Sequence, residues 1–502
     1  MIRLRLAVLA LATLLAAAAA AQPAASPAAQ PAASPEPPRR APAVDKATRH
    51  TLTLPGRTLD IEAAVATMRL ANPQGAAQAE VVTTAFLLAG AEPGRRPVTF
   101  ALNGGPGAAS AWLNLGAIGP WRIPFGSGPI VPSRAPVVAD NAETWLDFTD
   151  LVFIDPPGTG YSRVLGGDDV RRRIWSVDGD IETLAVVLRR WLEANHRLAS
   201  PKFIVGESYG GFRGPKLARA LLDHQGVGVS GLLLVSPVLD FNGRDAPWDL
   251  MRLVGRLPSM AAAARDAHGR AELRDAEEYA AGDFLLDLVR GEADPAAVSR
   301  LSGRVAALTG LDAALVRRRA GRIDLPTYLR EREPGRVDTP YDVTISAADP
   351  FPAAANDNSP DPVLDGLRGP VTSAMLDLYA GRLDWRPEGA PERQYELLNG
   401  GAAREWDYGR RNGRPEAMTD LRQFLALDPT ARVLVAHGLT DLVTPYFASK
   451  LLLDQVAPGD PAGRLGLAVY GGGHMFYSRD ASRAALHDDA AALVAAALAA
   501  RP

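Results

Sequence analysis

Short runs of consecutive apolar residues recur along the chain and are separated by stretches in which apolar residues follow helical spacing. The runs span residues 97–103, 150–156, 202–208, 231–238, 432–438 and 463–472. Strands that are apolar on both faces are typical of a parallel sheet that lies between layers of helices. The pattern therefore predicts an α/β fold with a mostly parallel sheet and helices on both of its faces.

Two regions depart from this alternation. Residues 50–90 combine β-branched alternation with Pro-Gly and Asn-Pro breaks, which is typical of antiparallel strands and turns. Residues 245–345 are rich in Ala, Arg, Leu and Glu with helical spacing, and we expect them to form a helical cap insertion. The predicted catalytic domain spans residues 49–502.

The N-terminus has the features of a targeting segment. Arg3 and Arg5 precede an apolar run that ends in small residues, which predicts a signal peptide over residues 1–21. Residues 22–48 are rich in Pro and Ala without periodicity, so we expect a disordered linker. The mature protein is expected to be exported, and thus periplasmic or secreted, without stable membrane association.

Composition narrows the chemistry further. The chain of 502 residues has a net charge of −3, which gives no strong field toward nucleic acid. It contains no cysteine, and this excludes disulfides, thiol catalysis and lipoprotein attachment.

The sequence Gly206-Glu207-Ser208-Tyr209-Gly210 lies between an apolar run and a helical pattern. A serine at such a strand-to-helix corner is typical of a nucleophile elbow, which holds the hydroxyl clear of the sheet. Common turn chemistry is the simpler interpretation of Ser and Gly here. The flanking strand and helix favour a catalytic serine.

A serine nucleophile needs a base and an orienting acid. Of the histidines, His474 follows a predicted strand and three glycines, a place suited to a side chain that reaches toward another loop. Asp441 lies just beyond the strand 432–438. The order Ser208, Asp441, His474 is the order found in α/β hydrolases.

Backbone N–H groups for a developing oxyanion would come from a glycine-rich loop. Residues 103–107, Asn-Gly-Gly-Pro-Gly, follow the strand at 97–103. A phosphate-binding loop would need Gly-Lys-Ser/Thr, and a dinucleotide site would need a third glycine and a downstream acid, which this stretch lacks. The second donor would be the N–H of Tyr209.

Together, "LNGGPGAAS", "FIDPPGTGYS", "GESYGGFRGP", "HGLTDLVTP" and "GGGHM" resemble, in order and spacing, the sequence blocks of the serine carboxypeptidase family (peptidase family S10). The resemblance extends over about residues 80–490 and identifies the chain as an exported bacterial member. It implies an α/β-hydrolase fold and a serine-type carboxypeptidase that removes C-terminal residues from peptides. It implies no metal or organic cofactor, and it leaves the oligomeric state open.

The resemblance also assigns roles to individual residues. It implies a catalytic triad of Ser208, Asp441 and His474, oxyanion donors at Gly105 and Tyr209, and binding of the substrate carboxylate by Asn103 and Glu207. An acyltransferase or esterase that uses the same triad, and a catalytically inactive binding scaffold, are the alternatives.

The chain departs from the family pattern at the carboxylate site. In the family, the glutamate at the position of Glu207 pairs with a second glutamate, and here Ala117 stands in that second position. Arg122 and Arg213 lie near these blocks as possible replacements, although a surface arginine is the simpler interpretation of each.

Overall fold

The computed structural model describes residues 45–125, 131–134, 136–241, 248–354, 359–387, 394–409, 415–456 and 463–500. The expected signal peptide and the linker up to residue 44 lie outside the described residues. The last residues assigned to the linker, 46–48, instead belong to the first strand. Within the described ranges, no helix combines the length and the apolar character needed to cross a membrane.

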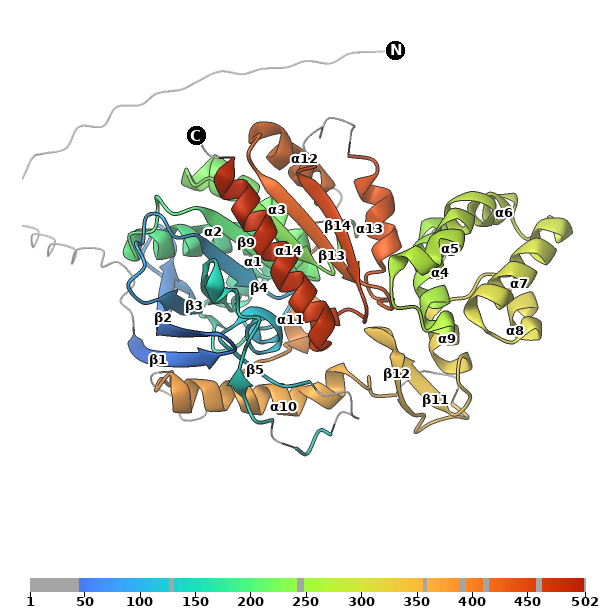
Figure 1. The fold of residues 1–502 in the computed structure, drawn as a ribbon, viewed down its shortest axis with the longest axis horizontal. Coiled ribbons are helices and arrows are strands. Elements are labelled where there is room, and N and C mark those ends of the chain that lie inside the picture. Colours follow the sequence, from blue (N-terminus) through green and yellow to red (C-terminus); the bar gives the residue numbers. More distant parts are fainter. Residues whose placement is uncertain are drawn as a thin grey trace, which may run out of the picture. The chain divides into compact units, whose positions relative to one another are not determined.

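A ten-stranded sheet forms the centre of the fold, in the order β1-β2-β3-β7-β4-β9-β10-β13-β14, with β8 paired to β3 (Figure 1). The strands β1, β2, β3 and β7 pair antiparallel, and the strands from β7 through β14 pair parallel. The bounds are β1 Lys46–Leu54, β2 Arg57–Ala71, β3 Ala77–Leu88, β4 Val98–Leu102, β7 Asp150–Ile154, β8 Arg163–Val164, β9 Lys202–Glu207, β10 Gly231–Val235, β13 Arg432–Gly438 and β14 Leu465–Tyr470. The predicted parallel sheet is thus confirmed, with each apolar run forming one strand.

Alternate residues of the parallel strands belong to two different cores. Leu233 and Val235 of β10 pack in the core that contains Leu486 and Ala490 of α14 (Asp480–Ala499). Leu232 and Leu234 pack instead with α2 (Val177–Ala194) and α3 (Tyr209–Gln225). Because side chains alternate across a strand, the sheet is covered by helices on both faces. This is the α/β-hydrolase fold.

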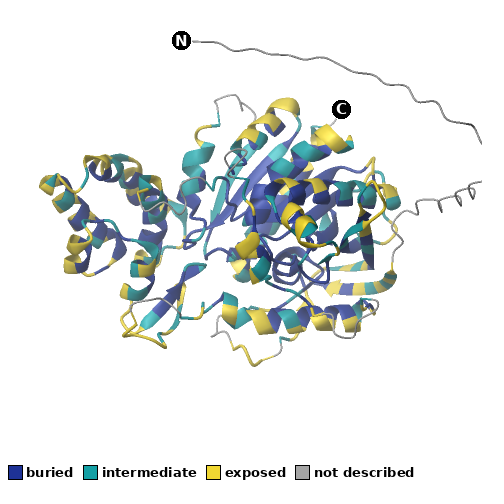
Figure 2. Ribbon diagram, turned by 180° about the vertical axis from the view of Figure 1, so that it is seen from behind, coloured by how far each residue is buried: buried dark blue, intermediate teal, exposed yellow. Residues whose placement is uncertain are grey.

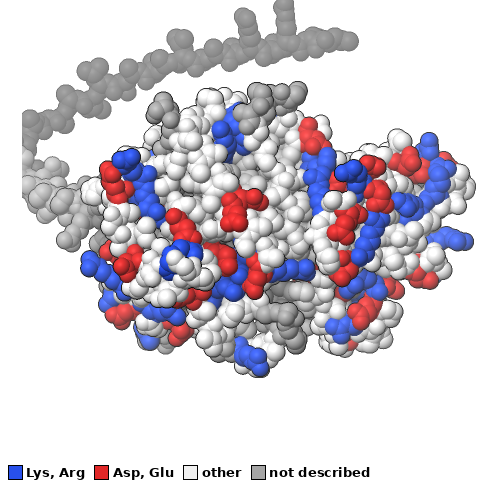
Figure 3. Space-filling view, in the orientation of Figure 1, with Lys and Arg blue, Asp and Glu red and all other residues white. Residues whose placement is uncertain are grey.

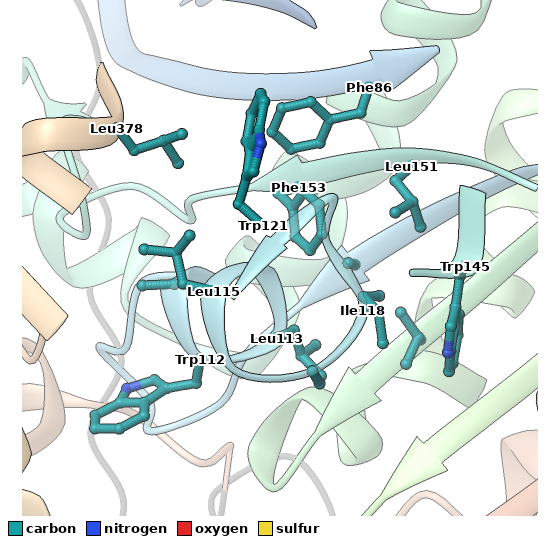
Figure 4. Close-up of a cluster of buried hydrophobic side chains, with 14 of the residues drawn as sticks. Phe86, Trp112, Leu113, Leu115, Ile118, Trp121, Trp145, Leu151, Phe153 and Leu378 are labelled. Carbon is teal, nitrogen blue, oxygen red and sulfur yellow. The ribbon is translucent and has the colours of Figure 1, made fainter. Parts of the chain in front are cut away.

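The core on the α14 side also holds η1, the π-helical turn Trp112–Ile118 that follows the glycine-rich loop. Figure 4 shows Trp112, Leu113, Leu115 and Ile118 around this turn, close to Trp121 and Phe153. All seven residues of η1 are buried. The segment that carries Ala117 is therefore a rigid part of the core.

A separate group of helices follows β10 and has its own apolar core. It comprises α4 Leu250–Arg265, α5 Arg274–Tyr279, α6 Leu285–Arg290, α7 Pro295–Thr309, α8 Ala313–Arg318 and α9 Leu325–Glu331, and the hairpin β11 Arg336–Thr339 and β12 Asp342–Ala348 follows. This core includes Leu439, Leu442 and Phe447, so the helices pack against the loop after β13 and against α13 (Tyr446–Leu453). Figure 2 shows the buried residues continuing into this group.

The other helices and strands are α1 Asp168–Ile174, α10 Leu364–Asp377, α11 Gly400–Glu405, α12 Met418–Leu427, and the short strands β5 Trp121–Arg122 and β6 Ala139–Asp140. Charges of both signs are interspersed over the face seen in Figure 3. This mixture accords with the small net charge of −3.

Candidate active site

Ser208 lies in a strained turn between β9 and α3. Its backbone has φ 59° and ψ −118°, a conformation that non-glycine residues rarely adopt and that costs on the order of 1–3 kcal/mol. A Cβ on Gly206 would lie 2.0 Å from the carbonyl oxygen of Gly210, so only glycine allows so tight a turn. The geometry is that expected of a nucleophile elbow.

Asp441 and His474 meet beyond the neighbouring strands β13 and β14. His474 Nδ1 lies 2.8 Å from Asp441 Oδ2, and both side chains are buried. The amides of Val443 and Thr444 donate to Asp441 Oδ1 at 2.8 and 2.9 Å. Because Nδ1 faces the carboxylate, Nε2 is the ring nitrogen left for a serine hydroxyl.

The surroundings keep Asp441 ionised. Burial opposes the charge, but the nearby His474 and the hydrogen bonds from His474 and Thr444 outweigh it, so the pKa of Asp441 lies below its usual value. The Thr444 hydroxyl is 2.6 Å from Asp441 Oδ2 and 3.1 Å from His474 Nδ1. A carboxylate that remains charged can orient the imidazole and stabilise its protonated form.

Contacts from two other elements fix the loop of His474. The Ser236 hydroxyl, one residue after β10, donates to the His474 carbonyl at 2.7 Å. The ring of Tyr341 packs edge-on against the imidazole with centroids 5.3 Å apart. Ser236 in turn follows Val235, whose carbonyl accepts the N–H of Ser208 at 2.9 Å. The consecutive residues Val235 and Ser236 therefore connect Ser208 to the loop of His474.

The glycine-rich loop lies directly against the elbow. A Cβ on Gly104 would be 2.6 Å from the backbone nitrogen of Tyr209 and 2.9 Å from the Cβ of Ser208. Gly105 has φ +100°, in the region that favours glycine. The loop thus lies beside Ser208 and the N–H of Tyr209, as an oxyanion hole requires.

Asn103 and Glu207 form a buried pair next to Ser208. Asn103 Nδ2 donates to Glu207 Oε2 at 2.8 Å, and Asn103 Oδ1 accepts the N–H of Leu113 at 3.0 Å. Burial raises the pKa of Glu207 to about 7, although His474, Tyr477 and Asn103 favour the charged form. Glu207 is therefore able to exchange a proton near neutral pH.

Tyr477 is a member of this cluster that the sequence did not single out. Its hydroxyl donates to Glu207 Oε2 at 2.8 Å, and its ring lies 3.1 Å from the position of a Cβ on Gly116. Tyr477 follows His474 by three residues, which is the one signal in the sequence that could have drawn attention to it. The tyrosine thus packs beside η1, the segment that carries Ala117.

The two arginines considered as carboxylate binders have other partners. Arg213 is 0% exposed and forms an ion pair with Asp180 at 2.6 Å, so the expectation of a surface arginine is wrong. It also donates to the carbonyl of Asn103 at 2.6 Å and lies over the ring of Tyr209. Arg122 is half-buried and lies 3.5 Å from Asp480. Arg213 therefore stabilises the backbone that carries Asn103, through its hydrogen bond to the Asn103 carbonyl.

Arg213→Met is expected to destabilise the fold by about 3–5 kcal/mol, because it leaves Asp180 buried and unpaired. Urea denaturation measures the change. Lys216→Met is the matched control, since Lys216 pairs with Asp420 at a partly exposed position, and it should cost less than about 1 kcal/mol. Equal losses for the two variants would contradict this role of Arg213.

His437, the last but one residue of β13, bonds to another partner than Asp441 or His474. Its Nε2 lies 2.9 Å from Ser449 Oγ, and burial lowers its pKa to about 4. A histidine that stays neutral and bonded to Ser449 is a structural residue.

Among the described side chains, no group of three or more His, Asp or Glu residues is arranged to hold a metal ion.

A model of the serine carboxypeptidase family matches residues 85–244. This range contains Asn103, Gly105, Glu207, Ser208 and Tyr209. It is shorter than the span of about residues 80–490 expected from the sequence blocks, and it does not reach Asp441 or His474.

Among curated proteins, serine carboxypeptidase-like 45 of Arabidopsis thaliana is 30% identical over 165 residues, or 31% of this chain and 33% of that protein. The pheromone-processing carboxypeptidase KEX1 of Phaeosphaeria nodorum is 32% identical over 124 residues, or 24% of this chain and 17% of that protein. The chain thus covers a third or less of the length of these two relatives.

Among solved structures, a brefeldin A esterase described as a bacterial homologue of human hormone-sensitive lipase aligns with a TM-score of 0.38. The two sequences are 12% identical, and the alignment covers 90% of this chain and 81% of the esterase chain. The fold assignment rests on the strand order described above. Residues 85–244, which include the strained serine turn and the glycine-rich loop, are the part of the chain that is similar to the serine carboxypeptidase family.

Proposed function

We propose that this protein is a serine hydrolase of the carboxypeptidase type, which hydrolyses C-terminal peptide bonds through an acyl-enzyme on Ser208. The observation that carries the proposal is the buried contact between His474 and Asp441, on loops adjacent to the strained Ser208 turn. His474 would take the proton of the Ser208 hydroxyl and later return it to the leaving amine. The N–H groups of Gly105 and Tyr209 would bind the oxyanion.

Asn103 and Glu207 would recognise the free carboxylate of the substrate. An ionised Glu207 repels a carboxylate, whereas a protonated Glu207 donates a hydrogen bond to it. Binding of a C-terminal acid therefore requires that Glu207 carries its proton. A lone carboxyl with a pKa of about 7 keeps that proton up to near neutrality.

The recognition of the free acid is expected to be less stringent than with two glutamates. Loss of one charge-assisted hydrogen bond costs on the order of 1.5–3 kcal/mol, or roughly ten- to a hundred-fold in kcat/KM. The preference for a blocked dipeptide acid over its amide should thus be modest. The optimum should lie near neutrality, with activity toward the acid falling as pH rises through about 7, where Glu207 loses its proton.

The measurement is kcat/KM for the dipeptide acid, its amide and an acyl ester from pH 4 to pH 8. A sharp acid optimum with strong rejection of the amide would contradict this account of the carboxylate site. Ester cleavage without peptide cleavage, or product transfer to an added alcohol, would favour the esterase or acyltransferase alternative.

Export to the periplasm or the medium is a further proposal, based on the sequence of residues 1–21. The mature chain would then begin near Gln22. N-terminal sequencing of the exported protein tests this, and a retained N-terminus that needs detergent would indicate a membrane anchor.

A further inference from the structure

Two donors converge on one oxygen of Glu207. Asn103 Nδ2 and the Tyr477 hydroxyl each donate to Oε2 at 2.8 Å. The orientation of the Asn103 amide is fixed, because its Oδ1 accepts the N–H of Leu113. Neither donor loses its proton near neutral pH, since burial and then the nearby Glu207 carboxyl raise the pKa of Tyr477 well above its usual value.

The other oxygen, Oε1, accepts no hydrogen bond from any residue in the described part of the chain. A proton on Oε2 would either meet the Asn103 N–H or turn the Tyr477 hydroxyl into an acceptor, and the hydroxyl hydrogen would then have no acceptor among the described residues. A proton on Oε1 avoids both costs, so this arrangement favours Oε1 as the position of the proton in neutral Glu207. The carboxyl then presents a single donor in a defined place, while Oε2 remains an acceptor.

Tyr477 is held rigidly enough to enforce this arrangement. It lies in η6 (Phe476–Ser478), it is 0% exposed, and its ring packs against Gly116 of η1. The charged groups whose fields reach Glu207 are His474 and Asp441. Neither of them donates a hydrogen bond to Glu207, so the choice between its two oxygens is left to the neutral donors Asn103 and Tyr477.

We propose that Tyr477 is a positioning residue that fixes the proton of Glu207 on Oε1, so that one carboxyl, together with Asn103, suffices to bind the terminal carboxylate of a peptide. The inference rests on the proposed carboxypeptidase function. It names the group that compensates in this chain for Ala117.

Tyr477→Phe tests the proposal, because it removes the hydroxyl and keeps the ring against Gly116. The lost hydrogen bond favoured the charged form of Glu207, so its removal raises the pKa of Glu207. For the dipeptide acid, the fall of kcat/KM at high pH should therefore move up by about one pH unit, since a hydrogen bond to a charged group contributes about 1.5 kcal/mol. The preference for the acid over the amide at pH 6 should fall at least three-fold, because Oε1 and Oε2 then share the proton.

The pH profile for the ester, which has no terminal carboxylate, should keep its shape in Tyr477→Phe. Tyr470→Phe is the matched control, because Tyr470 also donates to a carboxylate, Asp489, at 2.6 Å. It should move neither profile. Glu207→Gln is the second variant: its amide oxygen replaces Oε2 and its NH₂ group replaces the protonated Oε1, so the fall at high pH should disappear.

An unmoved acid profile in a folded Tyr477→Phe variant would overturn the inference, as would equal losses toward acid and ester. Retention of the fall at high pH in Glu207→Gln would also overturn it, because another group would then control binding of the acid. Failure of the proposed function has a different signature, namely a native protein that does not cleave the dipeptide acid at any pH.

Discussion

Ser208→Ala is expected to abolish almost all turnover, with a loss on the order of 10⁶ in kcat. His474→Ala should lose a similar amount, and the double variant should be little worse than either single variant. The reason is that the imidazole accepts the proton of the serine hydroxyl during the attack on the substrate. Without either group this step does not occur, so the loss of the second group adds little. Steady-state hydrolysis of the dipeptide acid and of the ester measures the effect.

A fluorophosphonate probe provides an independent check of the same residue. Native protein should gain one probe adduct at Ser208, and Ser208→Ala should gain none. His487→Ala is a control for the histidine change. His487 Nε2 lies 3.2 Å from Asp147 Oδ2 and bonds to none of Ser208, Asp441 and His474, so this variant should retain turnover. A folded native protein that is not labelled would support the inactive-scaffold alternative.

Asp441→Asn is expected to reduce kcat by about 10⁴, the second-largest effect, while the fold is retained. The amide can still accept the N–H groups of Val443 and Thr444 through its oxygen. It would then turn its NH₂ group toward His474 Nδ1, which favours the imidazole tautomer that cannot accept the serine proton through Nε2.

Asp454→Asn is the matched control for this change. Asp454 pairs with Lys450 near the end of α13, and the substitution should leave kcat within a few-fold of the native value. Similar losses in the two variants, or no loss in Asp441→Asn, would show that the orienting acid lies elsewhere.

The parallel sheet could be predicted because the apolar runs of β4, β7, β9, β10 and β13 are buried on both faces, a property that a single stretch of sequence displays directly. The run of β14, at the edge of the sheet, is only partly buried. The serine turn could also be predicted, because the glycines on either side of Ser208 are visible in the sequence. The structure explains them: a Cβ on Gly206 or Gly210 would lie 2.0 or 2.3 Å from a backbone oxygen. The positions of Asp441 and His474, just beyond successive strands, suggested that they lie close together, because the carboxyl ends of parallel strands share one edge of the sheet.

The supporting contacts could not be predicted, because they join segments that are far apart in the sequence. Tyr477 reaches Glu207 across 270 positions. The carbonyl of Tyr341 accepts the N–H of His474, although α10 to α13 lie between them in the sequence. Arg213 was interpreted as a surface residue because arginine is usually exposed. Arg213 is buried because it pairs with Asp180 of α2. The two residues lie on different helices, and only the packing of α2 against α3 brings them together.

The proposed function is that this chain removes residues from the C-terminal ends of peptides with Ser208 as the nucleophile. Digestion of a defined peptide mixture, read by mass spectrometry over time, is the decisive measurement. We expect successive losses of single C-terminal residues, blocked N-termini that stay intact, and no loss in Ser208→Ala. Internal cleavage, losses from the N-terminus, or unchanged peptides in the presence of native protein that the fluorophosphonate still labels would contradict it.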